Sequence, residues 1–310
     1  MNHAVRSAAG ARPDAHETLV FVGHGSRDPR SAQALRRLTA AVAARTNATD
    51  AVDAREVRVR LAFLELSEPL LEDVRETVSG PVRIVPLLLG SAFHARVDLP
   101  GRLAAVADAR PDLELSVAGV LGPHPLLDAA VAARARDLLA GGCDGLVVLG
   151  TGSSHESANA EVDALADRLG LVLDVPIVAG FVTRGRTQAE AVAQLRASGA
   201  TRIGLVPWFL APGLLLDSGL ATARELGLAV ATVGASGPDR DTPDARGAQE
   251  AVTLADDEGL ARLVLRRAGE PATPIDATDA ADADAVAAAP AVPGEAQGVD
   301  GAVRRVLTAA

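Results

Sequence analysis

The sequence predicts an α/β protein made of two doubly wound, parallel-sheet halves that are related by internal duplication. Three observations lead to this prediction. Short apolar runs alternate with stretches of helical periodicity, glycine-containing turns end the first apolar run of each half, and the order of elements is repeated once along the chain. With 310 residues and 48% hydrophobic content, the chain can fill a core in each half.

The first half contains apolar runs that alternate with amphipathic segments. The apolar runs predict strands at 18–23, 57–66, 82–89 and 113–121. Helical spacing of apolar residues predicts helices at 28–45, 67–78, 97–109 and 124–140. Pro29 stands near the start of the first helix, and Ser67 is the expected cap of the second. This alternation predicts a parallel sheet covered on both faces.

The second half repeats the strand, glycine turn and helix of the first, beginning with GLVVLGTGSSHESANAEV at residue 145. The corresponding pairs are Gly23 and Gly150, Gly25 and Gly152, Ser26 and Ser153, Phe63 and Phe181, and Pro86 and Pro207. Two units of this size match ordinary domains.

The duplication predicts four segments. They are a mobile tail at 1–17, a first α/β domain at 18–141, a second at 142–268, and a disordered tail rich in Ala, Asp and Pro at 269–310. The second domain carries an acidic insertion near 236–257, and a helix at 258–269 is expected to close it.

Composition excludes several classes of protein. A net charge of −10 argues against nucleic-acid binding, and the single cysteine, Cys143, excludes a disulfide and a cysteine zinc cluster within the chain. No run is long enough for a membrane span, and the first 17 residues lack the apolar core of a secretory signal. We therefore expect a cytoplasmic protein with no membrane or nucleic-acid partner.

The first three predicted strands of the first half end in ionisable residues: in His24, in Glu65 and in the loop that carries His94. The second half has Thr151, Thr183 and Leu215 at the matching places. The carboxyl ends of parallel strands meet at the edge where open α/β sheets bind ligands. Two imidazoles and a carboxylate there suit a divalent first-row metal ion. Taken singly, each residue has an ordinary alternative: a loop hydrogen bond for His24, solvation for Glu65, and a helix cap for His94.

Other motifs give no competing function. GHGS and GTGSS are neither a dinucleotide fingerprint, a Walker loop nor a nucleophile elbow. We expect His124 and His155 to start helices or turns, and Cys143 to pack inertly.

The segments FVGHGSRDPRSAQAL, AFLELSEP and VPLLLGSAFHARVDLP, in this order, resemble the sirohydrochlorin chelatases of the CbiX/SirB type. The resemblance covers about residues 18–228 and includes the degenerate second copy found in long members of that family. It implies a chelatase-like fold with the tetrapyrrole between the halves. It also implies that His24, Glu65 and His94 bind the metal and assist its insertion.

The resemblance implies an enzyme that inserts Fe2+ or Co2+ into sirohydrochlorin, on the way to sirohaem or a cobalamin precursor. The metal is then a substrate, and no cofactor is expected. Nickel would suit the same ligands. The ring carboxylates would be received by arginine forks and turn N–H groups, for which the candidates are Gly25, Ser26, Arg27, Arg96, Gly152, Ser153 and Arg184.

Two alternatives from other classes remain open. One is a non-catalytic tetrapyrrole or metal carrier with the same fold, and the other is a structural two-domain protein with fortuitous histidines. A monomer is compatible with either enzyme or carrier, because the duplicate supplies the second wall of the cleft.

Overall fold

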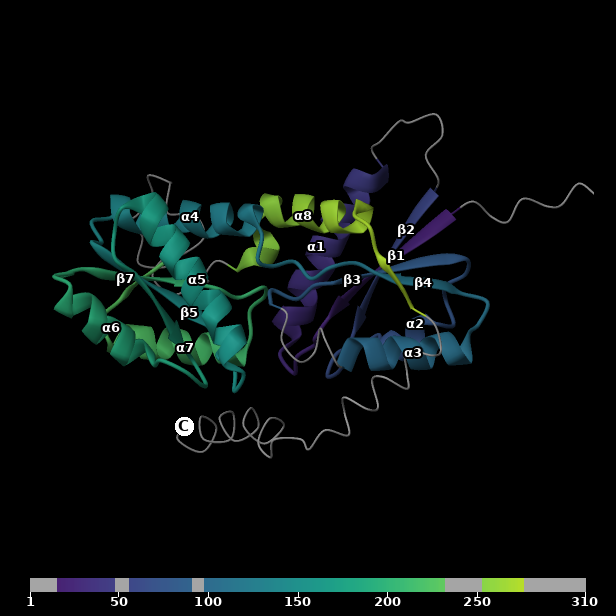
Figure 1. Ribbon diagram of the computed structural model, residues 1–310, viewed down its shortest axis with the longest axis horizontal. Helices are drawn as coiled ribbons and strands as arrows, with labels where there is room; N and C mark the ends of the chain where they lie inside the picture. Colours follow the sequence, from purple (N-terminus) through teal and green to yellow (C-terminus); the bar gives the residue numbers. More distant parts are fainter. Residues whose placement is uncertain (1–15, 48–55, 91–97, 232–252, 276–310) are drawn as a thin grey trace, which may run out of the picture.

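The computed structural model describes residues 16–47, 56–90, 98–231 and 253–275. Within these ranges the chain forms two separate parallel sheets that lie side by side, each flanked by helices (Figure 1). No helix in these ranges has the length and apolar character that a membrane crossing requires.

The first sheet has the strand order β2-β1-β3-β4-β9. Its parallel strands are β1 (His16–Gly23), β2 (Glu56–Phe63), β3 (Pro81–Pro86) and β4 (Glu114–Val117). The helices that follow the first three are α1 (Pro29–Asn47), α2 (Leu71–Val74) and α3 (Leu99–Ala109). One face of the sheet packs on α2 and α3, and the opposite face packs on α1. This is the doubly wound arrangement that the alternating sequence pattern predicts.

The second sheet repeats this topology with the order β6-β5-β7-β8. Its strands are β5 (Gly145–Gly150), β6 (Ile177–Phe181), β7 (Ile203–Pro207) and β8 (Ala229–Val230). Its helices are α5 (Glu156–Leu173), α6 (Gln188–Ala197) and α7 (Leu214–Glu225).

The register of the strands confirms the duplication. Gly23 pairs with Phe63 at the carboxyl ends of β1 and the edge strand β2, and Gly150 pairs with Phe181 at the same place on β5 and β6. Beyond the strands, the Phe63 N–H donates to the Pro69 carbonyl and the Phe181 N–H to the Arg186 carbonyl. The loops that follow β2 and β6 are therefore closed by equivalent hydrogen bonds, in addition to the common order of the parallel strands.

Two helices at the junction of the halves each pack on the sheet of the opposite half. The helix that follows β4, α4 (Pro125–Ala140), contacts β7 and α5 of the second sheet. The helix α8 (Glu258–Gly269) contacts α1 and β3 of the first sheet, and the two helices lie against each other over the junction (Figure 1).

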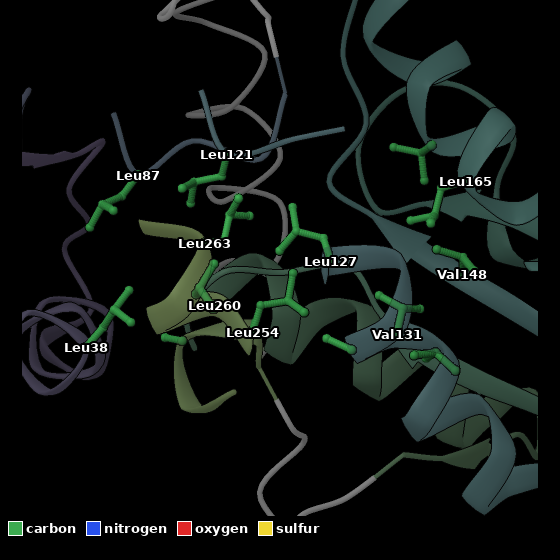
Figure 2. Packing of buried hydrophobic residues seen from close by; sticks show 14 of the residues in the cluster. Leu38, Leu87, Leu121, Leu127, Val131, Val148, Leu165, Leu254, Leu260 and Leu263 are labelled. Carbon is green, nitrogen blue, oxygen red and sulfur yellow. The ribbon is translucent and has the colours of Figure 1, made fainter. Parts of the chain in front are cut away.

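This exchange corrects the expectation that residues 258–269 close the second half. Because α4 packs on the second sheet, the face of the first sheet beside α1 is covered instead by the apolar side of α8, with Leu260, Leu263 and Val264 buried. One hydrophobic core consequently runs through both halves. Figure 2 shows Leu38 and Leu263 of the first-sheet layer in the same cluster as Val148 and Leu165 of the second.

Polar contacts hold in place the segment that leads from the second half back to the first. The short 3-10 helix η3 (Leu254–Asp256) precedes α8, and its Leu254 and Ala255 N–H groups donate to the Phe209 and Leu210 carbonyls. Arg134 on α4 is buried, donates to the Thr253 carbonyl at 3.2 Å and lies 3.3 Å from the Asp257 carboxylate. Burial lowers the pKa of this guanidinium, and the Asp257 charge partly opposes that shift.

The structure corrects the expected segments at several ends. β1 begins at His16, inside the expected tail at 1–17. Thr253, Leu254 and Ala255, expected in the acidic insertion, are buried in the shared core, whereas 236–252 lie outside the described residues.

The strand β9 (Thr273–Ile275) corrects the expected start of the disordered tail at 269. It pairs antiparallel with β4, because the chain leaving α8 arrives at the open edge of the first sheet. Arg83 fixes the connection by donating to the Glu270 carbonyl at 2.7 Å. The remainder of the expected tail, 276–310, lies outside the described residues.

Replacement of Leu263 by alanine is expected to lower the free energy of unfolding by about 2–5 kcal/mol, because a fully buried leucine leaves a cavity in the shared core. The measurement is urea denaturation. Its control is the exposed neighbour Arg262→Ala, for which a change within about 0.5 kcal/mol is expected. Equal stability losses in the two variants would show that α8 does not seal this core.

Truncation distinguishes the docked part of the C-terminal segment from the rest. A chain ending at Ile275 should melt like the full-length protein, because it keeps β9 and every described contact of Glu270. A chain ending at Gly269 should melt several degrees lower, since each kcal/mol corresponds to about 2–4 °C in a domain of this size. Identical melting of both truncated chains would contradict a stabilising role for β9.

Candidate functional site

The two loops that follow β1 and β2 lie against each other at the carboxyl edge of the first sheet. Backbone pairing continues past the strands, because the Leu64 N–H donates to the Gly23 carbonyl and the Glu65 N–H to the His24 carbonyl, both at 2.9 Å. His24 and Glu65 therefore become neighbours, with Nδ1 of the imidazole 3.5 Å from Oε1 of the carboxylate.

The His24–Glu65 pair is accessible from solvent while one of its atoms is shielded. The side chains are 40% and 49% exposed, respectively, whereas Nδ1 of His24 is buried. A carboxylate facing Nδ1 favours the tautomer with its proton on that nitrogen and its lone pair on Nε2. In that tautomer the imidazole can ligate a metal ion or accept a proton through Nε2.

Gly25 permits the close approach of the two loops. Its φ is +99°, and a Cβ at this position would lie 1.6 Å from the Glu65 carbonyl oxygen. Any side chain would therefore separate the loops and move Glu65 away from His24. The GHGS motif has a glycine here for this reason.

Ser67 ties the same two loops together with its hydroxyl. Its Oγ accepts from the Ser26 N–H at 3.1 Å and donates to the Ser26 carbonyl at 3.0 Å. The sequence predicts that Ser67 caps a helix, but α2 begins later, at Leu71. The hydroxyl instead serves as a bridge between loops, a role that only the fold brings about.

The matching loops of the second half keep the backbone and lose the ionisable groups. The Thr183 N–H donates to the Thr151 carbonyl at 2.9 Å, as that of Glu65 does to His24. The Thr183 hydroxyl also donates to the Thr151 carbonyl, at 2.8 Å. Gly152 has a φ of +87°, and a Cβ there would lie 2.3 Å from the Arg184 carbonyl oxygen.

Two serine N–H groups predicted to receive the substrate carboxylates already donate to other side chains of the protein. The Ser26 N–H donates to Ser67, and the Ser153 N–H donates to Oδ1 of Asn159 at 2.9 Å. Arg27 and Arg184 have exposed side chains beside these turns.

His94 and Arg96 lie in residues 91–97, outside the described residues, so their place in the site stays a prediction. The structure brings His24 and Glu65 together. Within the described residues, no group of three or more His, Cys, Asp or Glu side chains could hold a metal ion.

Sequence reasoning missed a contact across the two halves beside the site. Arg30, in the first turn of α1, pairs with Asp28 and also with Asp217 in the first turn of α7. Hydrogen bonds from Arg30 lower the pKa of the Asp28 carboxyl, and Asp28 and Asp217 together raise the pKa of Arg30. The DPR sequence at the helix start signals the local pair, but nothing local identifies Asp217.

Three further residues behave as the sequence predicts. His124 is the N-cap of α4, where its Nδ1 accepts from the Leu126 N–H at 3.1 Å, and burial lowers its pKa. His155 is the N-cap of α5, and Cys143 is buried.

Comparisons with known proteins agree with the fold of two related α/β halves. A sirohydrochlorin ferrochelatase of Bacillus subtilis strain 168 is 29% identical over 208 residues, which cover 65% of this chain and 77% of the relative. The crystal structure of the sirohydrochlorin chelatase SirB from Bacillus subtilis subspecies spizizenii in complex with cobalt superposes with a TM-score of 0.61 at 21% identity, covering 84% of this chain and 99% of SirB.

SirB from Bacillus subtilis with Fe3+ superposes with a TM-score of 0.60 at 22% identity, covering 87% of this chain and 97% of that one. These likenesses establish a chelatase-like fold. The sequence profile of the family described as CbiX matches residues 18–138 and 145–230, one segment in each half. Because that match spans well over half of the 310 residues and includes both strand-end loops, the chain belongs to the CbiX family.

Proposed function

We propose that this protein is a chelatase that inserts Fe2+ or Co2+ into sirohydrochlorin. The observation that supports this most directly is the His24–Glu65 pair, 3.5 Å apart at adjacent strand ends in a member of the CbiX family. The Bacillus subtilis relative is itself a sirohydrochlorin ferrochelatase. We place the reaction in the cytoplasm and assign it to a single chain, because both halves that would enclose the ring belong to one polypeptide.

His24, Glu65 and His94 are proposed to hold the incoming metal ion. Imidazole nitrogen and carboxylate oxygen are ligands that suit Fe2+ and Co2+, and the carboxylate partly balances the charge of the dication. The partial exposure of His24 and Glu65 allows a hydrated ion to reach them from solvent. Both side chains come from loops whose backbones are fixed to each other, so the ligands are held before the metal arrives.

Insertion also requires the removal of protons from the ring. A dication that enters the macrocycle replaces two pyrrole N–H protons, so charge balances when both protons leave to bases or to solvent. Neutral imidazole is a base near physiological pH, and the carboxylate beside Nδ1 stabilises the imidazolium that forms. The geometry of the His24–Glu65 pair supports such a proton route from the ring toward water.

The carboxylates at the rim of sirohydrochlorin are proposed to bind to arginines of both halves. Arg27 and Arg96 are the candidates in the first half and Arg184 is the candidate in the second, with the glycine turns at Gly25 and Gly152 beside them. We do not assign this role to the Ser26 and Ser153 N–H groups, because they already donate to the side chains of Ser67 and Asn159.

The experiment that tests this function is an anaerobic assay with sirohydrochlorin and Fe2+, Co2+ or Ni2+ in turn, followed by the absorbance of the metallated ring. Acceleration of insertion over the uncatalysed reaction, under multiple-turnover conditions, is the expected result. Binding of the ring without acceleration would identify a carrier and overturn the proposal.

His24→Ala should lower kcat for insertion by about a hundredfold or more, because the imidazole lone pair that can bind the metal ion or accept a ring proton is lost. Glu65→Gln should lower it by about tenfold or more, because the amide keeps the shape but neither the charge nor the basicity. His124→Asn is the matched control, since asparagine keeps the cap of α4.

Thermal melting of these variants separates loss of chemistry from loss of folding. Wild-type kcat in a well-folded His24→Ala protein would exclude this histidine from the reaction. A fully active Glu65→Gln protein would leave Glu65 with a structural role only.

Arg184→Ala should raise KM for sirohydrochlorin about tenfold with little change in kcat, because a carboxylate contact made equally before and during the reaction contributes to binding alone. The control is Arg196→Ala, an arginine in the last turn of α6, at the opposite end of that helix from the site. Unchanged KM in the Arg184 variant would make it an ordinary surface charge.

A further inference from the structure

Leu66 combines two unfavourable features next to Glu65. Its backbone has a φ of +60°, and its side chain is 51% exposed. The Ser67 N–H donates to the Glu65 carbonyl at 2.7 Å, which closes a γ-turn around Leu66. Glycine would adopt this conformation without the steric cost that a Cβ brings. Strained residues of this kind cluster at functional sites, so the position points to a role for the leucine side chain.

The turn is fixed on both sides. Before Leu66, the Glu65 N–H donates to the His24 carbonyl, and after it the Ser67 hydroxyl bonds to both backbone groups of Ser26. These contacts supply the energy that holds a leucine in a left-handed conformation. They also keep its side chain at a constant place relative to the His24–Glu65 pair.

A second exposed leucine follows a glycine of the other half that lies near Ser26. Leu214, the first residue of α7, is 44% exposed and follows Gly213. A Cβ on Gly213 would lie 3.9 Å from Oγ of Ser26. Ser26 is thus approached by Ser67 from the first half and by Gly213 from the second, and an exposed leucine stands next to each of them.

The other large apolar side chains that are exposed in the described part of the chain are Leu171 and Val172. They lie at the end of α5, which runs from the carboxyl edge of the second sheet to its opposite edge. Two of the exposed leucines therefore stand next in the chain to residues that lie near Ser26. The other two exposed apolar side chains lie at a remote helix end, which serves as an internal control.

We propose that Leu66 of the first half and Leu214 of the second half contact the apolar face of the tetrapyrrole, an inference that rests on the proposed function. A tetrapyrrole is a flat conjugated ring with its charges at the rim, so a site for it needs apolar surface at the centre and cations at the border. Leu66 directly follows Glu65, where the metal must meet the ring nitrogens. At the corresponding place in the second half Arg184 follows Thr183, which suits the rim.

The experiment measures two quantities for each variant: the Kd for metal-free sirohydrochlorin by absorbance titration, and the anaerobic insertion rate. Leu66→Gly removes the side chain and relieves the backbone, so its melting temperature should equal or exceed that of the wild type. Its Kd should rise about tenfold, as expected when a buried leucine contact is lost. Leu214→Ala retains a good helix former and should raise the Kd about threefold or more.

Two controls match these variants. Asp174→Gly relieves the same kind of backbone conformation, a φ of +54° at the end of α5, and Leu171→Ala removes an exposed leucine there. Both should leave the Kd unchanged. An unchanged Kd in Leu66→Gly overturns the inference, and so does a slower insertion rate without a change in Kd, because Leu66 would then act only through Glu65.

The test also separates this inference from the proposed function. If the wild type binds the ring but does not insert metal, the chelatase proposal fails, while a weaker Kd in Leu66→Gly still supports the leucine contact. If the wild type does not bind sirohydrochlorin, both are overturned.

Discussion

The close backbone approach between the loop after β1 and the loop after β2 is the constraint on which the candidate site depends. Only a residue without a Cβ fits at Gly25, since the space is occupied by the Glu65 carbonyl oxygen. The approach allows the His24 and Glu65 backbones to pair beyond the strands and lets Ser67 bond to Ser26. The positions of the His24 and Glu65 side chains are therefore set by these backbone contacts. The attraction between the two side chains contributes little, because it is weak for exposed groups.

A second constraint fixes the two halves to each other. Because α4 packs on the second sheet and α8 returns to the first, both sheets contribute to one core. Arg30 adds a polar contact between α1 and α7 next to the candidate site. A shared core holds the two halves at a defined distance from each other, which a flexible linker would not do.

The duplicated loops show what is kept when the chemistry is removed. Gly152 retains the left-handed conformation and close contact of Gly25, and the Thr183 N–H retains the hydrogen bond of Glu65. The two ionisable residues are replaced by threonines, and the hydroxyl of Thr183 donates to the Thr151 carbonyl. Backbone geometry at the sheet edge is thus independent of the ionisable side chains, which can be lost from one copy without loss of the fold.

The sequence by itself determined the fold class, the duplication and the position of the candidate ligands at strand ends, because strand and helix periodicities and glycine turns are local signals. It predicted that His24 and Glu65 meet, since parallel strands bring their carboxyl ends to one edge. It did not determine that α8 covers the first sheet, that β9 joins β4, or that Ser67 bridges two loops. An amphipathic helix or a serine hydroxyl specifies only that it needs a partner. The tertiary structure decided which partner each of them finds. The apolar side of α8 packs on the part of the first sheet that α4 leaves uncovered, and the Ser67 hydroxyl bonds to the neighbouring backbone of Ser26.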